Sequence, residues 1–280
     1  MKSWLMNPVL NKEFKLRFRS LKSFLGVLFY VLAIGIIVIG MIFVQQLSSM
    51  GGVNPEQSRE LFMILAVLQF ALIIFITPGL TAGVISSERE RQTLNILLTT
   101  SQSSSSIIIG KLVSSVAFLL LLIIASLPLY SIVFLYGGIS PRELLTVFAL
   151  NVFTVFVIGS LGVMFSTFIR KTIAAMVTTY GVMLFLVGGT GFLALIATSF
   201  TQMSQTGTPT TNILVYLLAM FNAPITLVNL FQPSIAEEIA RMSGVSFPLW
   251  GAHLISYTLI FITAIVLSVR KLRPKMKAKK

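Results

Sequence analysis

The chain has no cysteine, no aspartate and only one histidine, so side chains that commonly hold metals or act in catalysis are scarce. Without cysteine it can form neither disulfides nor thiolate metal sites. Its eight acidic residues are all glutamates, and they lie in segments that flank long apolar runs. Hydrolases and metal enzymes need carboxylates or histidines that converge inside the fold. The composition therefore argues against an enzyme with its own catalytic centre.

A phosphate-binding loop of the form G-x-x-x-x-G-K-[ST] is also missing from the sequence. Gly110-Lys111 is followed by leucine and lacks the upstream glycine. The chain therefore cannot hydrolyse ATP by that route. If it works as a pump, its energy must come from a partner.

Long apolar runs dominate what is present. Apolar residues make up 56% of the chain, which indicates a membrane protein. Six runs are long enough to cross about 30 Å of hydrocarbon as helices. They cover residues 21–47, 61–85, 107–136, 144–169, 172–200 and 249–269. Thr77-Pro78-Gly79 is expected to kink the second run, and Pro128 to break the third. The sequence therefore predicts an all-α membrane protein, with residues 1–280 forming one domain.

The net charge of +13 is distributed unevenly along this pattern. With six spans and a cytoplasmic N-terminus, every Lys and Arg except Arg59, Arg142 and Arg241 lies on the cytoplasmic side, as the positive-inside rule requires. We therefore expect a multi-pass protein of the plasma membrane with both termini in the cytoplasm. The basic tail 270–280 lacks aromatic residues for base stacking, so anionic lipids are expected partners and nucleic acid is not.

The stretch 212–230 is apolar enough to count as a seventh span, but Asn222 and Pro224 interrupt it. A seventh span would place the basic tail outside, against the charge rule. We interpret residues 201–248 as an external segment with a re-entrant or interfacial helical pair. Ser234 and Glu237 have the spacing of a capping box, which predicts a further short helix that ends at Ser243-Gly244.

Polar side chains inside the spans are few, and no span carries a charge near its middle. The missing charges argue against a carrier driven by an ion gradient. Gln69, Asn151 and His253 are each interpreted as a hydrogen-bond partner for another helix. Gly159 and Gly162 are interpreted as sites of close helix packing.

The connection 86–106 holds the only dense cluster of mixed charge between spans. Four residues of alternating charge precede leucines at helical spacing, and Ser86 or Ser87 can cap the start. This predicts a short amphipathic helix at the membrane surface with a charged end for another protein; a solvated loop is the alternative. The residues expected to make the contact are Ser87, Glu88, Arg89, Glu90, Arg91, Thr93, Leu94, Leu97 and Leu98.

At the N-terminus, basic and apolar residues interleave over residues 1–20, which predicts an amphipathic helix lying in the membrane interface. Its candidate residues are Trp4, Asn7, Pro8, Lys12 and Glu13.

These features resemble ABC-2 type transporter permeases over roughly the whole chain. The family's loop between the second and third spans has a charged run, a Thr-Leu, paired leucines, a Ser/Thr-rich break and a Gly-Lys. Here these are Glu88 to Arg91, Thr93-Leu94, Leu97-Leu98, Thr99 to Ser106 and Gly110-Lys111. Gln92 stands where the family has glycine, and a glutamine favours an unbroken helix. Asn7-Pro8 with Lys12-Glu13, and Asn222-Ala223-Pro224, resemble further family elements.

The resemblance implies the permease subunit of an ATP-driven ABC exporter of the ABC-2, or type V, kind. The loop would be a coupling helix that docks on a separate ATP-binding subunit, and ATP would reach the complex only through that subunit, with no cofactor bound directly. A second permease copy or a paralogue would complete the pathway. Two alternatives remain: a non-transporting membrane anchor or sensor that recruits a cytosolic partner, and an ion-coupled carrier.

Overall fold

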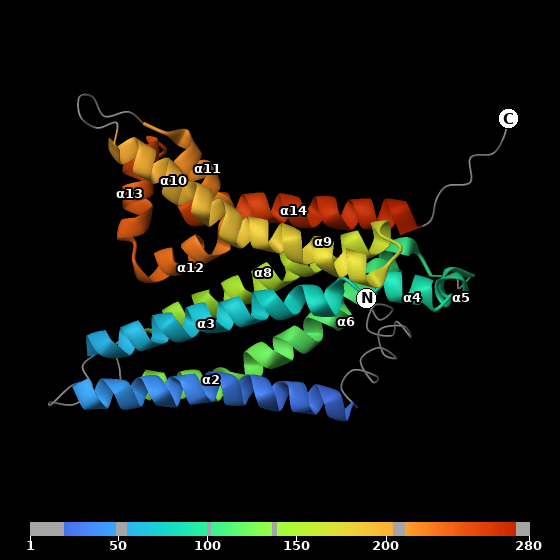
Figure 1. Ribbon diagram of the computed structural model, residues 1–280, viewed down its shortest axis with the longest axis horizontal. Coiled ribbons are helices and arrows are strands. Elements are labelled where there is room, and N and C mark those ends of the chain that lie inside the picture. The colour runs from blue at the N-terminus through green and yellow to red at the C-terminus, as the bar shows by residue number, and fades with distance from the viewer. Residues whose placement is uncertain (1–19, 49–54, 100–101, 136–138, 204–210, 273–280) are drawn as a thin grey trace.

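Figure 1 shows the computed structural model of the chain, which describes residues 20–48, 55–99, 102–135, 139–203 and 211–272. Within these ranges all regular structure is helical. The N-terminal helix predicted around Trp4, Asn7, Pro8, Lys12 and Glu13 lies outside the described residues. The helices are α2 Leu21–Ser48, α3 Pro55–Thr81, α4 Ser86–Glu90, α5 Leu94–Thr99, α6 Ser104–Ala125, α7 Leu127–Leu135, α8 Pro141–Phe168, α9 Thr172–Leu184, η1 Phe185–Gly189, α10 Thr190–Met203, α11 Ile213–Phe221, α12 Ala223–Phe231, α13 Ser234–Ser243 and α14 Leu249–Leu272.

Six helical stretches are long and apolar enough to cross a membrane, which confirms the predicted all-α membrane fold. They are Ser23–Val44, Ser58–Glu90, Ser104–Leu135, Pro141–Phe168, Thr172–Thr201 and Leu249–Leu272. The second has 33 residues, whereas about 20 suffice to cross the hydrocarbon. Its charged last turns, Ser86–Glu90, therefore extend beyond the membrane.

Helix α8 lies at the centre of the bundle and packs against α3, α6, α9 and α14. Its approach to α3 depends on Gly162, because a Cβ atom there would lie 2.9 Å from Thr81 Cβ and 3.2 Å from the Ala82 backbone nitrogen. A Cβ on Gly159 would lie 3.2 Å from Leu112. The interpretation of both glycines as packing sites is confirmed.

The outer helices cover this centre incompletely. In the most apolar part of the second, third and fourth spans 56%, 61% and 56% of residues are buried. The first, fifth and sixth spans bury only 17%, 22% and 28%. Their exposed apolar faces are suited to lipid tails or to a second membrane chain.

Three spans are interrupted locally. The third changes from α6 to α7 at Ser126, two residues before Pro128, as predicted from the proline. In the second, α3 continues through Pro78 to Thr81 and is separated from α4 by four turn residues. The fifth span contains the π-helical segment η1 between α9 and α10.

The interrupted stretch predicted from Asn222 and Pro224 is a pair of helices, α11 and α12, bent by 94°. Asn222 caps α12, because its side-chain oxygen accepts a hydrogen bond from the Ile225 amide at 2.9 Å. Its amide nitrogen donates to the Val187 carbonyl oxygen at 2.6 Å and to Thr190 Oγ1 at 3.0 Å. The bend is therefore fastened to the fifth span at η1 and the start of α10.

The carbonyl groups at the end of α11 are satisfied from α14. His253 Nδ1 lies 2.9 Å from the Met220 carbonyl oxygen, and the Tyr257 hydroxyl donates to the Phe221 carbonyl oxygen at 3.0 Å. Non-helical backbone at membrane depth requires such partners from the protein. His253 is therefore an interhelical hydrogen-bond partner, as predicted. Asn151 instead donates within its own helix, to the Val147 carbonyl oxygen at 2.9 Å.

Gln69, the third side chain predicted to bond to another helix, departs further from that prediction than Asn151 does. It is fully buried, and neither polar atom of its side chain has a hydrogen-bond partner within the described part of the chain. The interhelical bond expected for it is therefore not formed there.

The capping box predicted at Ser234 and Glu237 is wrong. Pro233 occupies the N-cap position of α13 without a side-chain bond, and the Ala236 amide donates to Asn229 Oδ1 at 3.1 Å. Asn229 belongs to α12, so the cap comes from the preceding helix and leaves no local signature. The end of α13 matches the prediction, because Gly244 has a φ of +73°.

Candidate functional site

The connection between the second and third spans lies at one end of the bundle, as the positions of α4 and α5 in Figure 1 show. Helices α8 and α14 end there, and α9 begins there. Helices α11, α12 and α13 gather toward the opposite end.

The connection consists of two short helices, and not of one amphipathic helix as predicted. Helix α4 ends at Glu90 and α5 begins at Leu94. Between them Gln92 has a φ of +58°, in the left-handed region that favours glycine. The expectation that a glutamine would keep the helix unbroken is therefore wrong. The bend is present, and Gln92 adopts a strained backbone conformation to make it.

The start of α4 is capped by another span. The predicted serine cap is wrong, because Ile85 occupies the N-cap position without a side-chain bond. Instead the hydroxyl oxygen of Ser166, on α8, accepts hydrogen bonds from the amides of Ile85 at 2.8 Å and Ser86 at 2.9 Å. All three residues are buried. The contact fastens the end of the second span to the fourth.

Arg89 binds the end of the fourth span, at the last residues of α8. Its guanidinium donates to the carbonyl oxygens of Thr167 at 3.0 Å and Ile169 at 3.4 Å. The last carbonyl groups of a helix lack intrahelical donors and carry partial negative charge, so a cation is favourable there. Arg89 therefore extends the contact with α8.

Glu90 caps the start of the fifth span. One carboxylate oxygen accepts from the Thr172 amide at 2.9 Å, and the other from the Thr172 hydroxyl at 2.7 Å. These hydrogen bonds, the hydroxyl's first, lower the pKa of the Glu90 carboxyl below its usual value of 4.5. The carboxylate also faces the positive N-terminus of α9.

Glu88 joins the connection to the third span. Its carboxylate accepts from the Lys111 ammonium at 3.2 Å and from the Thr93 hydroxyl. The Lys111 side chain is only 4% exposed, so the carboxylate neutralises a cation that is almost fully withdrawn from water.

The leucines predicted to contact a partner lie differently from the charged residues. Leu94 is 7% exposed and belongs to the core, and Leu98 packs against the same core. The Leu97 side chain lies outside the described residues, and Ser87 is half-buried. Among the side chains of the connection that the structure describes, the exposed ones are polar: Glu90, Arg91, Gln92, Thr93, Thr99, Ser103 and Ser105.

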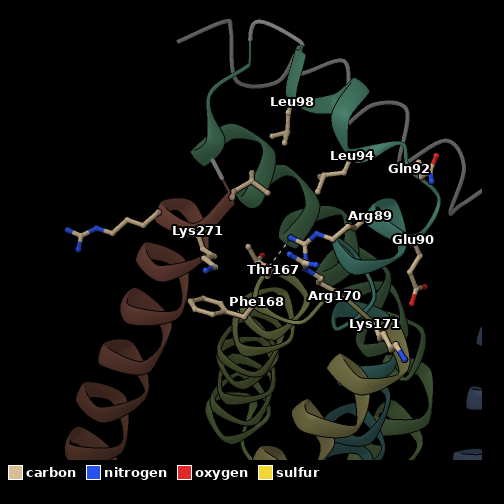
Figure 2. A pocket seen from close by; sticks show the side chains of 12 residues that line it. Arg89, Glu90, Gln92, Leu94, Leu98, Thr167, Phe168, Arg170, Lys171 and Lys271 are labelled. Carbon is tan, nitrogen blue, oxygen red and sulfur yellow. Dashed lines mark hydrogen bonds between the residues drawn. The ribbon is translucent and has the colours of Figure 1, made fainter. Parts of the chain in front are cut away.

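A groove of about 1180 Å³ lies beneath the connection, between it and the ends of α8 and α14 (Figure 2). Its charged lining consists of Arg89, Arg170, Lys171, Arg270, Lys271 and Glu90. Its apolar lining consists of Leu94, Leu98, Phe168 and Leu272. We name it the basic groove. The sequence showed basic pairs after the fourth and sixth spans, but not that they meet.

Comparisons with known proteins agree with this architecture. Residues 7–270 match the family described as ABC-2 family transporter protein. No curated protein matches the chain. The family match covers the first five candidate spans, the sixth as far as residue 270, the connection and the bent helical pair. The chain is therefore a multi-pass membrane protein of the ABC-2 transporter family, whose members are permeases of ABC transporters and work with an ATP-binding subunit.

Proposed function

We propose that this permease is an exporter in the plasma membrane, driven by a separate ATP-binding subunit that docks on the connection 86–106 in the cytoplasm. Charge carries this proposal. The Lys and Arg residues at the connection's end, within the described ranges, are Lys22, Arg89, Arg91, Lys111, Arg170, Lys171, Arg270 and Lys271. Those at the opposite end are Arg59, Arg142 and Arg241, beside the acidic Glu60, Glu143, Glu237 and Glu238. The positive-inside rule supports a cytoplasmic connection and cytoplasmic termini.

The contacts of α4 explain how a push from such a subunit reaches the membrane. Helix α4 continues the second span and is bonded to α6 through Glu88, to α8 through Arg89 and to α9 through Glu90. A displacement of α4 therefore acts on the second, third, fourth and fifth spans together. No ATP or other cofactor binds this chain directly in the proposal.

A second permease copy or a paralogue completes the pathway in this proposal. In the most apolar part of each span, the first and fifth spans bury the smallest share of residues, which supports a role for their outer faces against another membrane chain. The cargo then crosses between the two permeases.

Sidedness can be tested directly because the chain has no cysteine of its own. Thr99→Cys places one thiol on the exposed end of the connection, and Glu238→Cys places one at the opposite end. We expect a membrane-impermeant maleimide to label Glu238→Cys in intact cells, and Thr99→Cys only after permeabilisation. Labelling of Thr99→Cys in intact cells would overturn the proposal.

Docking can be tested by reversing one exposed charge. Arg91 is exposed, and its side chain makes no hydrogen bond within the described residues. Arg91→Glu therefore reverses a charge on the connection without removing a contact inside the protein. We expect it to reduce co-purification of the ATP-binding subunit from detergent by about tenfold, the effect of one charge pair at an interface. Arg142→Glu, at a residue that is also exposed but lies at the opposite end, is the matched control.

Equal co-purification with both variants would contradict docking at the connection. A partner that binds but neither hydrolyses ATP faster nor drives vectorial cargo movement would favour the anchor or sensor function. Uptake driven by an ion gradient without an ATPase would favour the ion-coupled carrier.

A further inference from the structure

We propose that the basic groove binds the headgroup of an anionic phospholipid. Its position supports this first. Phe168 and Leu272, which line it, are the last residues of two candidate spans, and its Lys171 directly precedes Thr172, the first residue of a third. The groove therefore lies at the boundary of the hydrocarbon, where the headgroups of one leaflet lie.

Its charge favours an anion. Five cations line the groove against one carboxylate, and that carboxylate already accepts two hydrogen bonds from Thr172. Arg170 and Arg270 are exposed, and neither forms an ion pair within the described part of the chain. Guanidinium groups match the geometry of phosphate oxygens, and basic pockets between membrane helices on the cytoplasmic side attract anionic headgroups.

Its apolar lining favours a lipid over an acidic protein segment. Phe168 is exposed, and Lys271 Nζ lies 5.7 Å from the centre of its ring. Leu94 and Leu98 lie above the groove on the connection, and Figure 2 shows both on the side of α5 that faces it. The phosphate of a phospholipid would contact the basic lining, and the first carbon atoms of its acyl chains would contact the apolar lining.

The bound headgroup would contact the leaflet below and the connection above, so lipid composition would act on the position of α4 and α5. Headgroup binding itself does not depend on the proposed function. Only a consequent change in ATP hydrolysis rests on docking of an ATP-binding subunit at the connection, so the two proposals can fail separately.

Native mass spectrometry of the detergent-purified full chain tests the proposal. The probes are phosphatidylglycerol and, as the neutral comparison, phosphatidylcholine. We expect the double variant Arg170→Gln with Arg270→Gln to retain phosphatidylglycerol about tenfold less than the wild-type protein, with phosphatidylcholine unchanged. Arg142→Gln with Arg241→Gln removes the same charge from exposed arginines at the opposite end and should leave both lipids unchanged.

Three further measurements decide the result. Arg170→Lys with Arg270→Lys keeps the charge and should restore most of the binding, which a merely misfolded protein would not do. Equal phosphatidylglycerol binding by the glutamine variant and its control would overturn the proposal. If millimolar inorganic phosphate displaced all phosphatidylglycerol from the wild-type protein, the groove would bind a free anion and the proposal would be overturned. If the glutamine variant kept its phosphatidylglycerol but no longer co-purified with the ATP-binding subunit, the groove would be a protein contact and the proposal would also be overturned.

Discussion

The bend at Asn222 and the connection at α4 solve the same problem with different chemistry. Each lies where helices are interrupted and backbone groups lack partners inside their own helix. At Asn222 the partners are buried side chains without a fixed charge: Asn222 itself, His253 and Tyr257. At the connection, a buried hydroxyl from Ser166 is joined by charged groups that water reaches, as for Glu90.

The difference indicates which end of the molecule can respond to its surroundings. Hydrogen bonds between buried groups without a fixed charge are little affected by salt. Contacts of exposed charged groups weaken with salt and change with protonation, and another protein can compete for them. We therefore expect the bend at Asn222 to stay fixed and the connection to move more easily.

The largest effect is expected from Asn222→Ala. The substitution leaves the Ile225 amide without its acceptor and removes both bonds to the fifth span. Because a buried unsatisfied group costs about 1–3 kcal/mol and three bonds are lost, we expect a loss of about 2–4 kcal/mol, seen as a lower unfolding temperature in detergent. Gln232→Ala, at an exposed residue of the same segment, should change little. An unchanged unfolding temperature for Asn222→Ala would remove the fixed half of the comparison.

A smaller loss is expected from Ser166→Ala at the connection. It leaves the amides of Ile85 and Ser86 without their acceptor, which we expect to cost about 1–3 kcal/mol. Thr167→Val is the control, because within the described residues that hydroxyl donates to the Val163 carbonyl oxygen of its own helix and to no other group. If the two variants unfolded at the same temperature, Ser166 would not fasten α4 to α8.

The spans and their interruptions could be predicted from the sequence because their causes are local. Apolar runs of sufficient length, Pro128 and Asn222 each determine structure within a few residues of themselves. The count of basic residues over the whole chain argued against a seventh span, and the structure shows a pair of helices bent by 94° in that stretch. The structural effects of apolar runs, Pro128 and Asn222 depend little on contacts with the rest of the chain.

The caps and the site could be predicted only in part, because their partners come from distant segments. The cap of α4 comes from Ser166, about 80 residues further on. The spacing of Ser234 and Glu237 suited a capping box, but the Ala236 amide donates instead to the side chain of Asn229 on the preceding helix. The leucines had helical spacing, yet Leu94 faces the protein's own core. Each error arose because tertiary contact overrode a local preference.

A pH-dependent effect is expected from Glu90, whose carboxyl has a lowered pKa when folded. Its contribution to stability is complete above the usual value of 4.5 and is lost as the pH falls through the lower folded pKa. Wild-type protein should therefore unfold at a higher temperature than Glu90→Gln at pH 7, and the difference should vanish well below pH 4.5. Glu238→Gln, exposed at the opposite end, is the control. A difference that persisted in acid would mean that charge is not what holds this contact.

The smallest effect, and the only gain, is expected from Gln92→Gly. A left-handed conformation costs a residue with a side chain about 1–2 kcal/mol, and glycine loses about 0.5–1 kcal/mol more entropy on folding, so a gain of about 0.5–1 kcal/mol should remain. Arg91→Gly is a matched control, because Arg91 has an ordinary φ of −80° and should lose stability. Opposite shifts in unfolding temperature at these neighbouring residues would show that the chain bends at Gln92 under strain. Equal losses would show that the bend relaxes, and that the connection is even more easily displaced than its bonds to α8 and α9 suggest.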